Sequence, residues 1–276
     1  MNLHDEKIET LGIIAGKGVY PLLLAESARK QGVKNIIVFA FKGETDSSIK
    51  RYADRVEWIY MGQLVKLLEA MKDSGVRKCV MVGQITPSNL FNVRPDAAMF
   101  SLLAGLKRKN AETIYGAVAA ECLIIGAEIM PASMFMEAHM PTKGTLTTNT
   151  PTETQSDDIK IGIEAAKTTS SLGIGQTVVI KEGMILAVEA FEGTDKTILR
   201  AGELGGPGSV VVKVAQKGHD MRFDIPVIGL HTMKVLKKAK VSVLAVEAGR
   251  CIFLEREEII READKLGIAV TVFESL

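Results

Sequence analysis

Short apolar runs alternate with amphipathic stretches along the first third of the chain. Runs of about 4–8 apolar residues are typical of buried strands, and apolar positions spaced three and four apart are typical of helices. These patterns predict strands at 11–15, 35–41, 56–60 and 78–84 and helices at 21–31 and 63–73. Strands that alternate with helices favour a parallel sheet covered on both faces.

The pattern changes after the fourth expected strand. Two apolar stretches, 97–107 and 112–125, predict helices that close the first domain. Residues 130–151 have no clear period and carry prolines and many threonines, which indicates a long connecting segment. We therefore expect two domains, residues 1–135 and residues 136–276.

The second half mixes both patterns. Two β-rich runs flank Glu182 and Gly183, which predicts a hairpin with a two-residue turn. The other expected elements are helices at 157–172, 195–203, 230–240 and 256–266 and strands at 209–214, 243–247, 251–254 and 269–273. The predicted fold class is α/β, with a Rossmann-like parallel-sheet N-terminal domain and a distinct mixed α/β C-terminal domain.

Composition narrows the function classes. The 34 basic and 33 acidic residues nearly cancel, so nucleic acid is not an expected partner. Three cysteines lie far apart in apolar stretches and are expected to be reduced and buried. The N-terminus has acids where a secretory signal needs positive charge, and the longest apolar stretch, 116–130, is shorter than the ~20 residues that span a bilayer. We expect a cytoplasmic protein whose membrane contact is peripheral.

A glycine turn follows the first expected strand. Gly16, Lys17 and Gly18 lead into a helix with Pro21 in its first turn, a position where the missing N–H costs nothing. Such a helix start offers backbone N–H groups and a positive dipole end to a phosphate. The turn lacks the third glycine and the ribose-binding acid of a dinucleotide fold, so NAD is disfavoured. The alternative is a turn that glycine merely permits.

The sharpest local feature is the segment GHDMRFDIP at 218–226. If it is extended, Asp220, Arg222 and Asp224 share one face. Two carboxylates can hold Mg²⁺ and the guanidinium can clamp a phosphate, which together suit metal-assisted attack of water on a pyrophosphate. The alternative is a solvent-facing strand edge with a local ion pair.

Two weaker features have functional and structural interpretations. Thr194 and Asp195 stand before an expected helix, where they either cap it or contact a nucleotide or metal. Four methionines at 130, 134, 136 and 140, with Phe135 and Leu146, form either an adaptable wall for acyl chains or part of the core.

Several stretches together resemble the I-type UDP-2,3-diacylglucosamine pyrophosphatase family of lipid A synthesis, once described only as a domain of unknown function. They are LGIIAGKGVYP, VGQITPSNLF, GQTVVIKEGMILAVEAFEGTDKTIL, VVVKVAQKGHDMRFDIPVIGLHTM and AVEAGRCIFLEREEIIREADKLGIAV. The similarity spans nearly the whole chain, and the motifs of the second half are the most specific. Lys17 departs from the family, whose members commonly have glycine there, and residues 92–140 match weakly.

This resemblance implies hydrolysis of UDP-2,3-diacylglucosamine to UMP and 2,3-diacylglucosamine 1-phosphate (lipid X), with Mg²⁺ or another divalent cation and the lipid product held between two domains. It also implies a catalytic aspartate in the segment 220–226, so Asp220 and Asp224 are carried as catalytic residues and metal ligands, and Arg222 as the phosphate clamp. The expected substrate contacts are Gly16, Lys17, Gly18, Gly83, Gln84, Gln176, Thr194 and Asp195.

The expected partners are the nucleotide sugar, its lipid product and the inner-membrane surface, contacted peripherally. Assembly into a homo-oligomer is left open. Two rival functions remain: a non-catalytic carrier of lipid phosphates and a Rossmann-type oxidoreductase.

Overall fold

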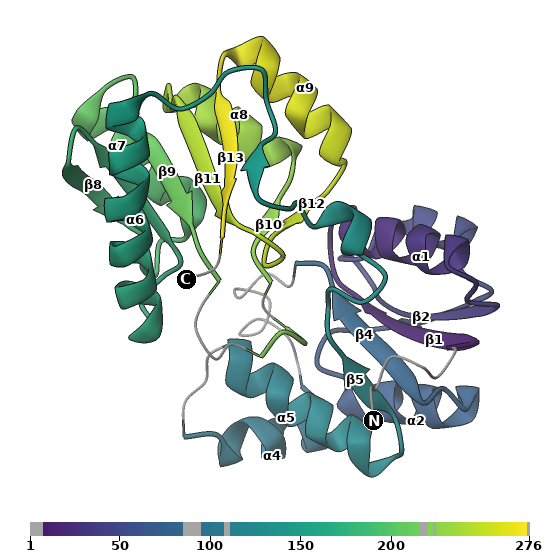
Figure 1. Cartoon of the computed structure of the whole chain (residues 1–276). Coiled ribbons are helices and arrows are strands. Elements are labelled where there is room, and N and C mark those ends of the chain that lie inside the picture. The colour runs from purple at the N-terminus through teal and green to yellow at the C-terminus, as the bar shows by residue number, and fades with distance from the viewer. Residues whose placement is uncertain (1–7, 85–94, 108–110, 216–219, 224, 275–276) are drawn as a thin grey trace. The chain divides into compact units, whose positions relative to one another are not determined.

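The computed structural model describes residues 8–84, 95–107, 111–215, 220–223 and 225–274. The chain divides into two compact units (Figure 1). The first comprises Met1–Met136 together with Asp220–Asp224, and the second comprises Glu137–His219 and Ile225–Leu276. The domain bounds expected from the sequence, 1–135 and 136–276, stay a prediction.

The first unit is built on a parallel five-stranded sheet in the order β3-β2-β1-β4-β5. Its strands are β1 (Thr10–Ala15), β2 (Asn35–Phe41), β3 (Arg55–Ile59), β4 (Lys78–Val82) and β5 (Glu128–Met130). Its helices are α1 (Tyr20–Lys30), α2 (Leu64–Ser74), α4 (Ala97–Gly105) and α5 (Ala111–Ile124), with a 3₁₀ turn η1 (Ser47–Arg51). The strand order reverses between β1 and β4, which makes that pair the switch point of the sheet.

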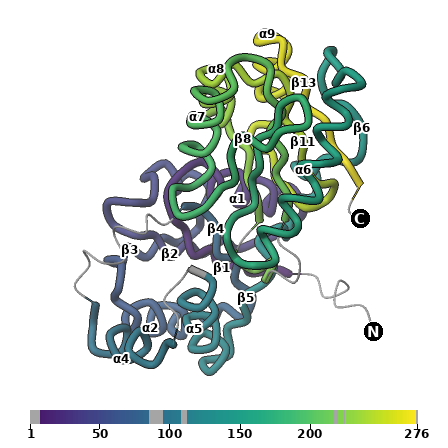
Figure 2. Tube along the Cα trace, turned by 90° about the vertical axis from the view of Figure 1, so that its left-hand side faces the viewer, coloured from purple at the N-terminus to yellow at the C-terminus, as the bar shows by residue number. Residues whose placement is uncertain are grey.

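Helices lie on both faces of this sheet. α1 lies on one face and α2, α4 and α5 lie on the other (Figure 1, and Figure 2 from a second side). Six of the seven residues of β2 are buried, because its two faces are both covered. Phe39, Met71 and Cys122 are fully buried in one cluster that joins β2, α2 and α5. The parallel sheet with two helical layers confirms the predicted Rossmann-like half.

The second unit has a mixed six-stranded sheet in the order β6-β13-β11-β9-β7-β8. Its strands are β6 (Gly144–Thr145), β7 (Thr177–Lys181), β8 (Met184–Val188), β9 (Val210–Lys213), β11 (Val243–Glu247) and β13 (Ala269–Phe273). A separate parallel pair joins β10 (Val227–Ile228) to β12 (Ile252–Phe253). The helices are α6 (Glu153–Ser171), α7 (Thr194–Gly205), α8 (Leu230–Lys238) and α9 (Arg256–Leu266), with a 3₁₀ turn η2 (Glu137–His139).

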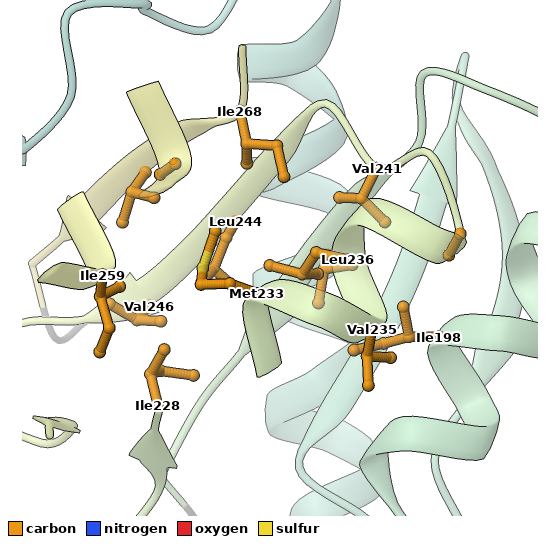
Figure 3. Packing of buried hydrophobic residues seen from close by; sticks show 14 of the residues in the cluster. Ile198, Ile228, Met233, Val235, Leu236, Val241, Leu244, Val246, Ile259 and Ile268 are labelled. Carbon is orange, nitrogen blue, oxygen red and sulfur yellow. The ribbon is translucent and has the colours of Figure 1, made fainter. Parts of the chain in front are cut away.

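The larger core of this unit lies between its sheet and three helices. Ile198 of α7, Met233 and Leu236 of α8, and Ile259 of α9 meet Leu244 of β11 in one cluster (Figure 3). All five are almost completely inaccessible to solvent. Helix α6 packs on a second cluster, with β7 and β9. The distinct mixed α/β unit confirms the prediction for the second half.

The hairpin of the second unit has the expected two-residue turn. Glu182 and Gly183 have φ values of 50° and 79°, the left-handed conformations that a tight hairpin turn requires. Their backbone N–H groups donate to the Asp158 carboxylate of α6, at 3.0 and 2.7 Å. Asp158 is only 3% exposed, so this carboxylate fastens the hairpin to the helix.

Three short strands of the structure were absent from the sequence prediction. Strands β5, β6 and β10 have two or three residues each, too few to show a period, and were not predicted. The three cysteines are free and buried as expected, and burial raises the pKa of Cys122 and Cys251 to about 12. In the described part of the chain, no helix is long and apolar enough to cross a membrane.

Asp158→Ala should lower the free energy of unfolding by about 1–3 kcal/mol, because two backbone donors lose a charged acceptor. Chemical denaturation measures the change. The matched control is Asp157→Ala on the exposed side of α6, where the side chain is 63% exposed and forms an ion pair with Lys160. Equal effects of the two substitutions would contradict the role given to Asp158.

Candidate active site

The loops after β1 and β4 contact each other backbone to backbone. Lys17 N donates to Gln84 O at 2.8 Å, and Gln84 N donates to Lys17 O at 2.9 Å. A Cβ on Gly16 would lie 2.8 Å from Gln84 O, and a Cβ on Gly83 would lie 2.8 Å from Gly16 C. Only glycine fits at both positions. The structure therefore brings together the predicted residues of the glycine turn and the loop after β4.

These paired loops lie where α/β sheets commonly bind ligands, outside the carboxyl ends of strands on either side of a switch point. Gly18 has a φ of 96°, and α1 begins directly after Val19 with no side-chain cap. A helix start without such a cap leaves N–H groups available to an anion. The geometry suits a phosphate group.

The segment from Asp220 to Phe223 is a turn, so the extended form considered from the sequence is not adopted there. Phe223 N donates to Asp220 O at 3.0 Å, which closes the turn. Arg222 Nε donates to Asp220 Oδ1 at 2.8 Å and to Oδ2 at 3.0 Å. These hydrogen bonds raise the pKa of Arg222 above its usual value. Asp224 lies outside the described residues.

The turn binds to the first unit through the peptide groups on either side of Ala132. Ala132 N donates to Met221 O at 2.9 Å, and Tyr20 Oη donates to Ala132 O at 2.6 Å. Tyr20 is the first residue of α1, directly after the glycine turn. Ala132 therefore links the turn that carries Asp220 and Arg222 to the helix start at the switch point.

An aromatic contact gives the turn a second anchor. The rings of Phe223 and Tyr115, a residue of α5, are 6.1 Å apart and tilted. Burial raises the pKa of Tyr20, so its hydroxyl stays a neutral donor to Ala132. Sequence reasoning missed Tyr20, Tyr115, Ala132 and Phe223 as supports of the site. The one available signal was an aromatic residue, Phe223, between charged residues.

The first unit also has an apolar pocket, next to the residue that contacts Phe223. Tyr115 lines it, together with residues at the carboxyl ends of β1, β2 and β4 and on three helices. The lining residues are Ile14, Phe41, Met61, Gly62, Gln63, Leu64, Leu67, Met81, Met99, Ile114, Tyr115 and Val118. Two of the residues considered for an acyl-chain wall lie in a core instead. Met136 is fully buried, and Leu146 packs into the core of the second unit.

The remaining candidate residues lie in the second unit. Thr194 Oγ1 donates to Glu189 Oε1 at 2.8 Å and accepts from Lys213 Nζ at 2.9 Å. Asp195 bonds to His231 Nε2 at 2.8 Å. Neither residue caps α7, whose N-cap is Gly193. Gln176, just before β7, accepts from Val214 N through its backbone oxygen at 3.0 Å.

The metal site expected at Asp220 and Asp224 stays a prediction. Both oxygens of Asp220 accept from Arg222. Asp224 is not described. Within the residues that the structure describes, no three histidine, cysteine, aspartate or glutamate side chains gather in a way that could hold an ion.

Fold and site together define an α/β protein with a glycine turn at the switch point of a parallel sheet and, anchored beside α1, a turn that carries Asp220 and Arg222 (the Asp-Arg turn). Both halves match known family models. Residues 10–139 match the LpxI N-terminal domain and residues 142–271 match the LpxI C-terminal domain. The chain belongs to the LpxI family.

One curated relative matches over almost the full length of both chains. It is the UDP-2,3-diacylglucosamine pyrophosphatase LpxI of Caulobacter vibrioides, 30% identical over an alignment of 273 residues that covers 94% of this chain and 96% of the relative.

Solved structures match only weakly. CobK precorrin-6A reductase shares 11% identity with a TM-score of 0.35, over 98% of this chain and 89% of that one. An N5-carboxyaminoimidazole synthetase from Staphylococcus aureus shares 14% with a TM-score of 0.28, over 70% and 41%. Neither similarity is strong enough to carry an argument.

Gly16→Ala should destabilise the first unit by about 1–3 kcal/mol, because the new methyl group meets backbone atoms that cannot move aside. Thermal unfolding measures the loss. Gly105→Ala at the end of α4 is the control, since a Cβ there meets nothing within 4 Å. If Gly16→Ala unfolds at the wild-type temperature, the close contact of the two loops is wrong.

Proposed function

We propose that this protein hydrolyses the pyrophosphate of UDP-2,3-diacylglucosamine, releasing UMP and 2,3-diacylglucosamine 1-phosphate. The observation that carries the proposal is the match to the Caulobacter pyrophosphatase along 96% of its length, with family models on both halves. The anchored Asp-Arg turn supplies suitable chemistry, because phosphoryl transfer needs cationic donors where negative charge develops.

Arg222 is the proposed phosphate clamp. Its side chain is 41% exposed, and Asp220 engages its Nε and one terminal nitrogen. The guanidinium has five N–H donors in a planar fork, so donors remain for a phosphate oxygen while the ion pair persists. Asp220 is then a positioning residue that fixes the plane of the guanidinium.

Asp224 is the proposed residue that activates water. Asp220 is bound by Arg222, which makes it the poorer proton acceptor of the pair, and the role therefore falls to the second aspartate of the segment. The water proton passes to the carboxylate, the water oxygen bonds to phosphorus, and the phosphoanhydride bond breaks to release the other phosphate. A divalent cation remains part of the proposal, as a requirement to be measured.

The apolar pocket of the first unit is the proposed place for part of an acyl chain. It encloses about 50 Å³, which is less than a whole chain, so most of the chain would lie outside it. Helix α4 contributes Met99 to the lining, has no charged residue and leaves Phe100 67% exposed. This surface suits peripheral contact with a membrane that holds the lipid substrate.

UMP release from UDP-2,3-diacylglucosamine in detergent micelles tests the function. With Mg²⁺ present we expect wild-type turnover, a loss of about 10²–10⁴-fold in Asp224→Asn, and a smaller loss in Asp220→Asn. Asp157→Asn is the control and should keep full activity. A chelator should abolish release if a divalent cation is required.

Absence of UMP release by the folded wild-type protein at every metal concentration would contradict the proposal. Lipid binding without release would favour a carrier of lipid phosphates. Full activity in both Asp220→Asn and Asp224→Asn would refute the roles given to the two aspartates while leaving the reaction in place.

A further inference from the structure

Residues 131–136 of the first unit form two overlapping turns after β5 (the double turn). The first turn contains Ala132, whose N–H donates to Met221 of the Asp-Arg turn and whose carbonyl oxygen accepts from Tyr20. The second turn begins at Ser133, inside the first. Because the two turns share residues, the conformation of the second turn bears on the position of Ala132.

The second turn has a strained residue at its third position. Met136 N donates to Ser133 O at 2.9 Å and closes the turn, and Phe135 has a φ of 64°. A turn whose third residue has a positive φ usually has glycine there, because a Cβ atom disfavours the left-handed conformation. Phenylalanine keeps this conformation only where its surroundings hold it in place.

Two side chains at the C-terminal end of α1 hold the carbonyl group of Phe135. Ser27 lies in the helix and Gln31 is its C-cap residue. Ser27 Oγ donates to Phe135 O at 2.5 Å, and Gln31 Nε2 donates to the same oxygen at 3.1 Å. The right-handed conformation would turn this carbonyl group in another direction and lose both hydrogen bonds. The two donors therefore favour the left-handed conformation.

The same side of α1 also holds the first turn. Tyr20, Ser27 and Gln31 are seven and four residues apart, a spacing that places side chains on one face of a helix. Tyr20 donates to Ala132 O at 2.6 Å, so the helix binds a carbonyl group in each of the two turns. One helix thus sets the conformation of the whole double turn.

Stability alone explains this arrangement poorly. The hydrogen bond of Gln31 is exposed, and water competes for both of its partners, so it adds little to the free energy of unfolding. Glycine in place of Phe135 would adopt the same conformation without help from α1. The two donors are better explained by the backbone conformation that they select.

We propose that Ser27 and Gln31 are positioning residues for the Asp-Arg turn. They keep Phe135 in the left-handed conformation, the second turn then keeps Ala132 in place, and Ala132 binds Met221. Neither side chain takes part in the reaction itself. The effect on turnover rests on the proposed function, whereas the effect on the double turn does not.

The double variant Ser27→Ala/Gln31→Ala removes both donors. Its kcat for UMP release should fall about tenfold with KM changed less than about twofold, because small displacements of reacting groups cost rate more than binding. The matched control is Glu26→Ala/Lys30→Ala, which removes an exposed ion pair from the same helix and should keep the wild-type kcat. Wild-type kcat in the Ser27 and Gln31 variant would overturn the proposal.

Phe135→Gly supplies the rescue. Added to the double variant, it should restore most of the kcat, because glycine takes the left-handed conformation at no steric cost. A purely structural role of the two donors predicts a further loss, since glycine also gives the unfolded chain more freedom. Absence of recovery would refute the proposal. A loss of turnover in Phe135→Gly alone would also refute it, because the phenyl ring would then be the functional group.

Amide hydrogen exchange tests the double turn without reference to turnover. The N–H groups of Ala132 and Met136 should exchange about tenfold faster in the double variant and be protected again when Phe135→Gly is added. Unchanged exchange would contradict the proposal. Faster exchange in a protein that releases no UMP would leave the positioning of the double turn in place and remove the proposed reaction. UMP release with unchanged exchange would do the reverse.

Discussion

Two peptide groups, one on each side of Ala132, hold the candidate active site of the first unit together. The N–H of Ala132 binds Met221 and its carbonyl oxygen binds the Tyr20 hydroxyl. Segments that are remote in the sequence meet through these two hydrogen bonds. Without them the Asp220–Arg222 pair would be an ordinary surface ion pair, of the kind that contributes little to stability and nothing to function. With them, the pair has a fixed place beside the start of α1.

The parallel sheet explains why the region at the start of α1 is suited to a phosphate group. Neighbouring parallel strands end at the same edge, so the glycine turn after β1 and the loop after β4 meet there. The close approach of Gly16 and Gly83 excludes every side chain from their contact. Backbone N–H groups and a helix start are then the nearest groups that a ligand meets, and both favour an anion.

The sequence predicts most of this fold, because long periodic segments carry a strong signal. Strand β2, strand β11 and helix α9 have the predicted bounds, and the hairpin turn at Glu182 and Gly183 has the predicted conformation. The two-residue strands β6 and β10 are set by tertiary pairing, which leaves no local pattern.

The site was less predictable than the fold. Alternating polar residues in the segment allowed an extended form, but Asp220 binds the side chain and backbone N–H of Arg222, and residues 220–223 form a turn. Local sequence also cannot show that this turn packs against Tyr115, because that contact depends on the tertiary fold.

The central claim is that the Asp-Arg turn contributes to UMP release because its contacts with the rest of the first unit hold it in place. The most direct test is the kcat for UMP release by Phe223→Ala. This variant removes the aromatic contact to Tyr115 and the contact of the ring with the Arg222 guanidinium, 4.9 Å from the ring centroid, and keeps the Asp220 and Arg222 side chains. Phe191→Ala, at a fully exposed phenylalanine of the second unit, is the control. We predict at least a tenfold fall in kcat for Phe223→Ala with the fold intact, and no change for the control. Wild-type turnover in Phe223→Ala would contradict the account.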